Sequence, residues 1–393
     1  MRILHTADWH VGKRLGRHDR MDDHAAVLDE IVATAEDESV DLVIVAGDLF
    51  DRPAAPIDAL RLVLDALARL ARPRRPVVAI AGNHDSAPLF DLLAPLLRHR
   101  NVHLAGAPRS PTDGGVLDLR AGDERALVAT LPFLRIGQAV DFMSDADTWA
   151  GAYSHRMRAL CAAYGRHLAD HGADAVRLLT AHVLISGARL GGLGAPRGER
   201  TIHMTEHYTA DATGLADGLE GRRAPHYVAL GHVHAPQSIP RAPVPASYAG
   251  SPLELDFGEA GEDKRLVVVE VAPGAAKATE RSVPLSAGRR LRRARGTWDE
   301  LRRRDDLDDA YLDLTVVTDG PEPGLADRVR QAFPRVVKVR IDYERARSET
   351  QSRGDQPWDR LYRDYYRQTH ETEAADELVA AFREIHGAAV EAP

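Results

Sequence analysis

The chain has 393 residues, of which 44% are hydrophobic and 28% are charged, and its formal net charge is −8. This composition is ordinary for a globular protein with one large domain and one or two smaller ones. The negative charge argues mildly against a protein that coats nucleic acid by bulk attraction, because such binding depends on basic contacts. The sequence contains no run of about 18 apolar residues, so we expect no transmembrane helix.

The N-terminus and the cysteine content indicate a cytoplasmic protein. The first residues, MRILHTADWH, lack the apolar run of a secretory signal. Cys161 is the only cysteine, which rules out an internal disulfide and suits a reducing compartment. We therefore expect cytoplasmic localisation and no membrane partner.

The first two thirds of the chain alternate predicted strands with predicted helices. Apolar runs typical of buried strands lie at residues 3–6, 42–46, 77–81, 176–181 and 227–231. Apolar residues at helical spacing lie in segments 18–37, 57–70, 89–97 and 153–168. The early part of this order predicts βαβ units with parallel strands. Short strands separated by Gly, Pro and Asp between residues 102 and 132 predict a second sheet.

The last third predicts two smaller parts. Small residues and arginines dominate near residues 273–296, where we place a domain boundary. Strands 311–317 and 336–341 with a helix at 325–333 predict a small α/β module, and the polar segment 351–357 predicts a linker. A single amphipathic helix is expected at 358–385. The predicted domains are residues 1–275, 285–345 and 356–393.

Polar residues that suit metal ions follow the predicted strands. They are Asp8, His10, Asp48, Asn83, His84, His182, His232 and His234. Residues at the carboxyl ends of parallel strands meet at one edge of a sheet, where open α/β sheets bind ligands. This donor set suits borderline divalent metals such as Mn²⁺, Fe²⁺ or Zn²⁺. Without His84, the seven remaining candidate ligands exceed the need of one ion and fit two ions that share a carboxylate.

A pair of metal ions about 3.5–4 Å apart can clamp the attacking and leaving oxygens of a phosphoryl group. With Asp8 and Asp48 as the carboxylates, two divalent ions leave the site net positive, which favours a phosphate ester and an acidic bound water. His84 is not needed as a ligand and could protonate the leaving oxygen. Asp51 could fix the tautomer of His84 by accepting its N–H.

Each motif taken singly also fits a simpler explanation. An Asp-x-His pair occurs in many surface turns, and His232 and His234 share a strand face by geometry alone. Gly and Asn in GNHD are turn residues. All the motifs lie at predicted strand ends and together supply a complete two-metal set, which favours the functional interpretation.

The segments DWH, GDLFDR, GNHD, AHVLISG and GHVH, in this order, resemble the calcineurin-like metallophosphoesterases. HTADWHVGKRL and YAGSPLELDFGE are similar, more narrowly, to the SbcD-type nuclease subunits of bacterial SbcCD complexes, relatives of the Mre/Rad repair nucleases. The resemblance covers about residues 1–270. It implies an α/β four-layer sandwich of two packed mixed β-sheets flanked by helices, with a capping domain and a helical C-terminal tail.

The resemblance also implies a role for each site residue. Asp8, His10 and His234 would hold one ion, Asn83, His182 and His232 the other, and Asp48 would bridge them. His84 would be the catalytic histidine, supported by Asp51. The implied ions are Mn²⁺. The implied activities are 3′–5′ exonuclease on double-stranded DNA ends and endonuclease on single-stranded DNA and hairpins, in DNA repair, replication and recombination.

The implied partners are DNA, an SbcC-type SMC-like ATPase and a second copy of the chain within a heterotetramer at the nucleoid. Trp358, Tyr362, Tyr365 and Tyr366 form an aromatic stripe that could bind the ATPase, or fold back on its own domain. Arg189 and Arg197 are candidate DNA contacts. The arginines at 289–295 could contact phosphates or form a solvated boundary segment.

Two other functions stay open from the sequence. A phosphodiesterase for small molecules or cyclic nucleotides could use the same metal site. A scaffold that binds DNA ends and regulates the ATPase could carry the site with cleavage only incidental.

Overall fold

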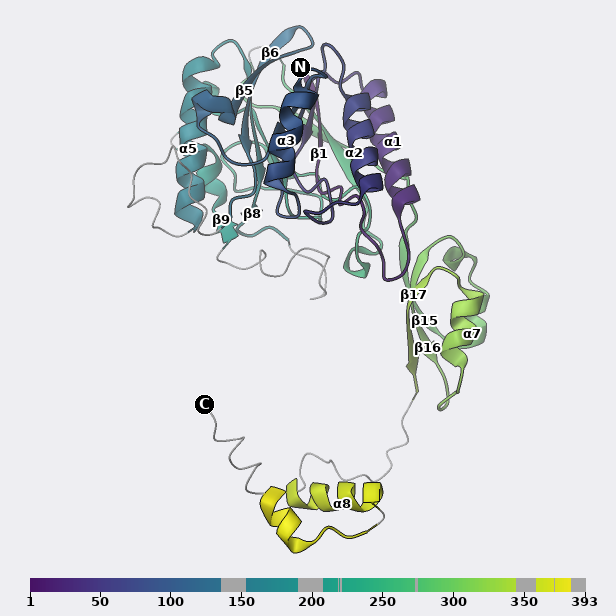
Figure 1. Cartoon of the computed structure of the whole chain (residues 1–393). Helices are drawn as coiled ribbons and strands as arrows, with labels where there is room; N and C mark the ends of the chain where they lie inside the picture. The colour runs from purple at the N-terminus through teal and green to yellow at the C-terminus, as the bar shows by residue number, and fades with distance from the viewer. Residues whose placement is uncertain are drawn as a thin grey trace. The chain divides into compact units, whose positions relative to one another are not determined.

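The structure, a computed structural model, describes residues 1–135, 153–189, 208–217, 219, 221–272, 275–343, 358–370 and 372–382. One compact unit comprises Met1–Val316 with Gly324–Ile341, and a second comprises Val317–Pro323 with Asp342–Pro393. The first unit is built around two β-sheets (Figure 1), each of six strands.

The first sheet has the order β14-β13-β1-β2-β3-β4. Its strands are β1 (Arg2–Thr6), β2 (Leu42–Val45), β3 (Val77–Ile80), β4 (Val102–Ala105), β13 (Arg265–Glu270) and β14 (Thr279–Pro284). β1 to β4 are parallel to one another, β13 is antiparallel to β1, and β14 is antiparallel to β13. The prediction that residues from 102 onward form the second sheet is wrong for β4, because a helical crossover returns it beside β3 as a further parallel strand.

Three helices cover the outer face of this sheet, namely α1 (Met21–Asp37), α2 (Ile57–Leu70) and α3 (Ala87–Arg98). Helix α1 begins three residues later than predicted. Leu15 and His18 exchange backbone hydrogen bonds of 3.1 and 2.9 Å, which closes a turn before the helix.

The second sheet has the order β11-β12-β10-β7-β6-β5. Its strands are β5 (Val116–Ala121), β6 (Glu124–Leu131), β7 (Val176–His182), β10 (Tyr227–Gly231), β11 (Gln237–Ser238) and β12 (Ala246–Tyr248). Helix α5 (Tyr153–His171) packs on its outer face and buries Cys161. Strands β8 (Leu184–Ile185) and β9 (Thr209–Ala210) form a small separate ladder.

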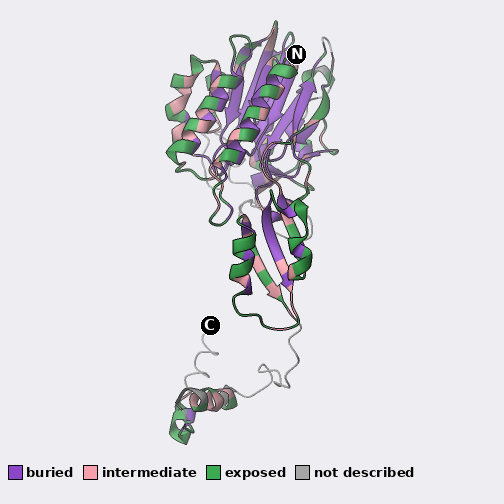
Figure 2. Ribbon diagram, turned by 90° about the vertical axis from the view of Figure 1, so that its right-hand side faces the viewer, coloured by how far each residue is buried: buried purple, intermediate pink, exposed green. Residues whose placement is uncertain are grey.

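The core has three apolar layers, as alternating side chains require. In β2, Leu42 and Ile44 point to the second sheet, whereas Val43 and Val45 point to the helices. A third layer lies between the second sheet and α5. The central strands β2, β3, β7 and β10 are accordingly wholly buried, whereas the edge strand β14 is largely exposed (Figure 2). The four-layer α/β sandwich that the family resemblance implies is confirmed.

A smaller sheet follows, of order β15-β16-β17. Its strands are β15 (Leu291–Gly296), β16 (Tyr311–Val317) and β17 (Val336–Asp342), accompanied by helices α6 (Trp298–Arg302) and α7 (Leu325–Ala332). Buried Arg20 anchors this module: its guanidinium donates to Asp23 at 3.0 Å and to the Arg289 carbonyl at 3.2 Å, and stacks over the Tyr311 ring.

Part of the arginine run therefore holds the fold together. Arg289 pairs with Asp23 at 3.0 Å and with Asp309 at 3.1 Å, and Arg290 lies 3.5 Å from Glu254. These two guanidinium groups already have carboxylate partners, which makes them poor candidates for phosphate contacts.

The tail is not the single helix that the sequence predicts. Helix α8 (Trp358–His370) ends before a non-helical stretch at 372–375, and a second helical segment follows at 376–382. The chain turns because the two segments cover each other: Tyr362 stacks on Phe382 at 4.3 Å, and Arg363 pairs with Asp376 at 2.7 Å. Tyr365 is 61% exposed.

The predicted linker lies outside the described residues. The predicted domain limits stay predictions, although β14 continues the first sheet to Pro284. Within the described part of the chain, no helix has the length and apolarity that a bilayer span requires.

His5 gives the fold a defined pH dependence. It lies between the sheets, with Nδ1 3.1 Å from the Tyr227 hydroxyl and Nε2 3.2 Å from the Leu230 carbonyl oxygen. Burial, assisted by the charge of Arg265, lowers the pKa of His5 to about 3. The folded chain thus keeps His5 neutral at pH values where the unfolded chain protonates it.

We expect His5 to destabilise the fold as the pH falls below about 6.5, because the unfolded state then binds the extra proton. In urea unfolding, acidification from about pH 7 to about pH 5 should cost wild type up to about 2 kcal/mol more than His5→Gln. His99→Gln, at an exposed position, should behave as wild type. An identical pH dependence in His5→Gln would contradict this expectation.

Candidate metal centre

The structure brings all the predicted metal ligands together at the carboxyl ends of the strands. β1, β2 and β3 of the first sheet lead to Asp8, His10, Asp48, Asn83 and His84, and β7 and β10 of the second sheet lead to His182, His232 and His234. All eight side chains are buried. The site is thus assembled across both sheets, whose packing sets its geometry.

The backbone at this edge is unusually strained. Four of the predicted ligands have positive φ, at 53° for Asp8, 46° for His10, 50° for Asp48 and 104° for His232. Non-glycine residues in such conformations cost on the order of 1–3 kcal/mol each and cluster at functional sites. The fold therefore tolerates strain where it turns these side chains toward one another.

Two glycines make the close approach of the loops possible. Gly47 has a φ of 98°, and a Cβ there would collide with the His182 ring. A Cβ on Gly82 would collide with the carboxylate of Asp48. The glycines of the GDLFDR and GNHD segments are thus required by the packing of the site itself.

Asp8, His10 and His234 form the first cluster of possible ligands. Nε2 of His10 lies 3.1 Å from Nε2 of His234, and one ligand atom of each of the three residues lies within 4.8 Å of the others. The Asp8 carboxylate also accepts the backbone N–H of His232 at 3.0 Å, which ties the first sheet to the second.

Asn83, His182 and His232 form the second cluster. The Asn83 side-chain oxygen lies 3.0 Å from Nε2 of His182 and 2.8 Å from Nδ1 of His232. These are the three residues that the family resemblance assigns to a second ion.

Asp48 lies between the two clusters. Its Oδ2 atom is 3.5 Å from Nε2 of His10 and 3.4 Å from Nε2 of His182. Its Oδ1 atom accepts the backbone N–H of His84 at 2.7 Å. One carboxylate thus faces both groups of ligands.

The outer nitrogens of two histidines are already engaged. Nδ1 of His182 donates to the Ala46 carbonyl at 2.8 Å, and Nδ1 of His234 donates to Glu259 at 2.9 Å. This arrangement fixes the tautomer and directs the Nε2 lone pair inward, as in histidines that bind metal. The donor set therefore fits divalent metal ions.

The electrostatics of the centre favour a cation. Burial raises the pKa of Asp8 to about 6. Burial alone would also raise the pKa of Asp48, but the histidines around it, His182 foremost, hold it well below its usual value. Burial would lower the pKa of His182, yet the Asp48 carboxylate raises it to about 9. Buried carboxylates here rely on positive charge held beside them.

His84 lies at the margin of the first cluster, its ring 4.6 Å from that of His10 and edge-on to it. Its Nδ1 donates to the backbone carbonyl of Asp51 at 2.7 Å. The sequence suggested that Asp51 accepts the N–H of His84. The acceptor is its main-chain carbonyl oxygen, whereas its carboxylate lies 3.2 Å from the ammonium of Lys13.

Sequence reasoning placed Asp85, the last residue of GNHD, at a strand end but gave it no role. Its buried carboxylate accepts the backbone N–H groups of Leu49 at 3.2 Å, Phe50 at 3.0 Å and Gly82 at 2.9 Å. Burial and the nearby Asp48 raise the pKa of Asp85 to about 7. The carboxylate thereby joins the loops that carry Asp48 and His84. In the sequence, the position of Asp85 directly after His84 was the feature that could have indicated this role.

Sequence reasoning also missed Glu259 and Lys264. Glu259 is fully buried, and besides His234 it accepts from Lys264 at 2.7 Å and from Ser251 at 3.1 Å. Burial alone would raise the pKa of Glu259, but Lys264 and His234 lower it to about 2. Glu259 is the last residue of the YAGSPLELDFGE segment. That segment contributed to the family resemblance, but none of its residues was assigned a role.

Of the two predicted DNA contacts, one lies within the described residues. Arg189 is exposed, and its backbone N–H donates to Gln237 at 2.8 Å. Arg197 lies outside the described residues.

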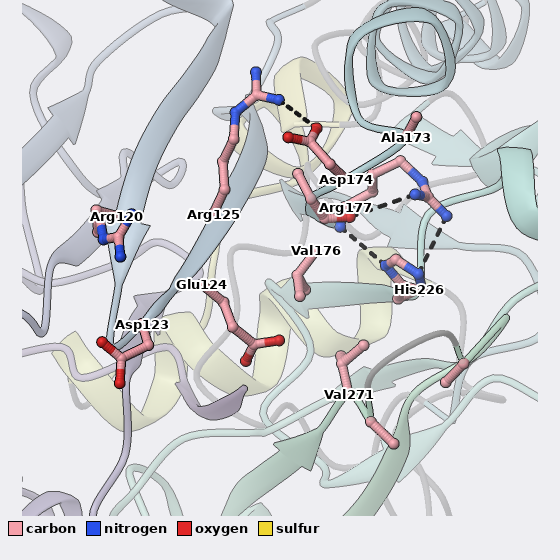
Figure 3. Close-up of a pocket in the computed structure, with 13 residues that line it drawn as sticks. Arg120, Asp123, Glu124, Arg125, Ala173, Asp174, Val176, Arg177, His226 and Val271 are labelled. Carbon is pink, nitrogen blue, oxygen red and sulfur yellow. Dashed lines mark hydrogen bonds and ion pairs between the residues drawn. The ribbon is translucent and has the colours of Figure 1, made fainter.

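A separate hollow of about 520 Å³ lies at the starts of β6 and β7, at the opposite ends of these strands from the metal centre (Figure 3). Several of its charged groups already have partners. Arg125 contacts Asp174 at 2.7 Å, and Arg177 lies 3.1 Å from Nε2 of His226. We assign no function to it.

Two family models match the chain. The calcineurin-like phosphoesterase model matches residues 1–236, and the model described as type 5 capsule protein repressor C-terminal domain matches residues 287–370. A solved Thermus thermophilus protein aligns at 14% identity with a TM-score of 0.37, over 72% of this chain and 98% of its own, which is too remote to bear on function.

Three similar curated proteins are each named as the SbcD component of the nuclease SbcCD. The Bacillus subtilis protein is 32% identical over 98% of this chain and 97% of its own length. The Rhodobacter capsulatus protein is 35% identical over 72% and 69%, and the Escherichia coli protein 31% over 73% and 69%.

The chain therefore belongs to the calcineurin-like phosphoesterases, and as such it is a phosphodiester hydrolase. Within that class it belongs to the SbcD-type nuclease subunits, as the length and number of the matches establish.

The contact between Glu259 and His234 gives the first testable expectation for the site. Glu259→Gln keeps the shape of the side chain but removes the charge that holds the Nδ1–H of His234. We expect the affinity for a divalent metal ion, measured by calorimetry with Mn²⁺ as the probe, to fall by about 10–100-fold. Glu262→Gln, at a more exposed partner of Lys264, is the matched control and should change little. Equal losses in both variants would contradict the role of Glu259.

Proposed function

We propose that the chain is the nuclease subunit of an SbcCD-type complex and hydrolyses phosphodiester bonds of DNA with two Mn²⁺ ions. The observation that carries this proposal is the place of Asp48 Oδ2, 3.5 Å from His10 and 3.4 Å from His182. A carboxylate shared between two ligand groups suits an ion pair that clamps a phosphate during in-line displacement.

The proposed roles follow the two clusters. Asp8, His10 and His234 would hold one ion, Asn83, His182 and His232 the other, and Asp48 both. When bound, the ions would supply an activated water and neutralise charge on the phosphate. The chain's own contribution is to orient the ligands through Ala46 and Glu259 and to exclude bulk water by burial.

His84 is the proposed catalytic residue outside the ligand set. Its Nδ1 proton is committed to the Asp51 carbonyl, so Nε2 is the atom that can hold or release a proton during the reaction. An imidazole so placed can stabilise charge on the phosphate or protonate the leaving oxygen. The Asp51 main chain keeps the ring oriented for either task.

The proposed substrates are double-stranded DNA ends, degraded 3′–5′, and single-stranded DNA and hairpins, cut internally, in repair, replication and recombination. The proposed partner is an SbcC-type ATPase, with two copies of the chain as a homodimer within a heterotetramer. The proposed location is cytoplasmic and nucleoid-associated. The names of the relatives support the proposal. So does the second family model, which reaches through α8, where Tyr365 is exposed.

Replacement of His84 tests the reaction directly. We expect His84→Ala to lower the rate of Mn²⁺-dependent cleavage of linear duplex and circular single-stranded DNA by about 10²–10⁴-fold, because proton transfer is lost. Mn²⁺ stoichiometry should stay at two, since His84 is not a proposed ligand. His99→Ala, at an exposed position on the same region of chain, is the control and should cleave as wild type. Chelator should abolish all cleavage.

The same assays separate the competing functions. Hydrolysis of a small diester without cleavage of DNA, also with the partner ATPase present, would indicate a small-molecule phosphodiesterase. A His84→Ala chain that keeps its cellular repair role would indicate a DNA-end scaffold.

A further inference from the structure

Two polar side chains, His5 and Tyr227, lie inside the layer between the two sheets, which also holds Ile3 and Ile44. Both are fully buried. Nδ1 of His5 lies 3.1 Å from the Tyr227 hydroxyl, and Nε2 lies 3.2 Å from the Leu230 carbonyl oxygen. Both contacts run from β1 to β10, which belong to different sheets. His5 is therefore a hydrogen-bonded link across a layer that is otherwise mainly apolar.

The two partners of His5 fix the position of its proton. A carbonyl oxygen only accepts, so Nε2 carries the proton and donates it to Leu230. Nδ1 must then accept from the Tyr227 hydroxyl, and the two rings meet edge-on with their centroids 5.9 Å apart. Apolar side chains in such a layer can shift past one another, whereas two directional hydrogen bonds specify one alignment of the strands.

Tyr227 is itself held from both sheets. Burial raises the pKa of its hydroxyl, and the carboxylate of Glu280 raises it further, so the hydroxyl keeps the proton that it donates to His5. Glu280, on β14 of the first sheet, accepts from the hydroxyl of Ser247, on β12 of the second, at 2.6 Å. The link between the sheets thus consists of two polar contacts side by side.

The strands that His5 joins end in the metal centre. Asp8 follows His5 by three residues on β1 and its loop, and His232 directly follows β10. A Cβ on Gly231 would collide with the Ala46 carbonyl oxygen, so the sheets touch at this point. The next crossing is the hydrogen bond from the His232 backbone N–H to the Asp8 carboxylate, at 3.0 Å. A shift of β1 along β10 would therefore move ligands of the two strands apart.

We propose that His5 is a positioning residue of the metal centre, which aligns β1 with β10 so that Asp8 meets His232 and His234. The inference rests on the proposed two-metal function. His5 acts through Tyr227 and the Leu230 carbonyl and not by binding an ion. Substitutions at such a distance from a ligand change its affinity by about 3–30-fold.

Three substitutions remove different parts of the link. His5→Leu removes both hydrogen bonds, and Tyr227→Phe removes only the hydroxyl. His5→Gln is the conservative variant, because its amide N–H can still donate to Leu230. Ile3→Ala is the matched control: Ile3 lies on the same face of β1, and its truncation leaves a cavity without touching the polar pair.

Two quantities are measured at about pH 7.5, where His5 is neutral in the folded and the unfolded chain. Calorimetry gives the affinity and stoichiometry for Mn²⁺, and urea unfolding of the metal-free chain gives the midpoint. We expect His5→Leu to lower the affinity by about 3–30-fold, and Tyr227→Phe and His5→Gln to lower it by less. Ile3→Ala should lower the urea midpoint but change the affinity by less than about twofold.

The outcomes separate the positioning role from stability and from the proposed function. Wild-type affinity in His5→Leu, or an equal loss of affinity in Ile3→Ala, overturns the positioning role alone. If His5→Leu does not fold, the same comparison between Tyr227→Phe and Ile3→Ala decides. Wild type that fails to bind two Mn²⁺ ions, or that cleaves no DNA even with its ATPase partner, overturns the proposed function instead.

Discussion

The buried carboxylate of Asp48 is the constraint on which the rest of the site depends. One of its oxygens accepts the His84 backbone N–H, and the other faces His10 and His182. A carboxylate with 2% of its side chain exposed needs compensation on every side, because an unpaired buried charge is very costly. The positive φ of Asp48 turns its carboxylate toward these partners, and the absence of a side chain at Gly82 leaves room for the carboxylate.

The second constraint is that two sheets must meet at the same edge. The first sheet contributes the carboxylates and the GNHD loop, and the second contributes His182, His232 and His234. The backbone contact from His232 to Asp8 crosses between them. The apolar layer between the sheets thus fixes distances in the metal centre.

A network of buried hydrogen bonds lies beside the site and links it to the three-stranded sheet β15-β16-β17. Glu259 and Lys264 hold His234, and a few residues earlier Glu254 accepts the backbone N–H groups of Gly261 and Leu291. Leu291 begins the first strand of the three-stranded sheet. The same short segment therefore serves both the metal centre and the attachment of that module.

The sequence alone indicated parallel βαβ units and a second sheet, because apolar runs that alternate with amphipathic segments permit few other arrangements, whereas the four-layer sandwich was implied by the family resemblance. The sequence also predicted that the candidate ligands meet, because parallel strands end at one edge of a sheet. The tertiary structure decided the contacts around them. The support of His234 by Glu259 joins residues 25 positions apart, and the partner of His84 is a carbonyl that any residue at position 51 would carry. Residue types mark donors and acceptors, but only the folded loops set which of them come within hydrogen-bonding distance.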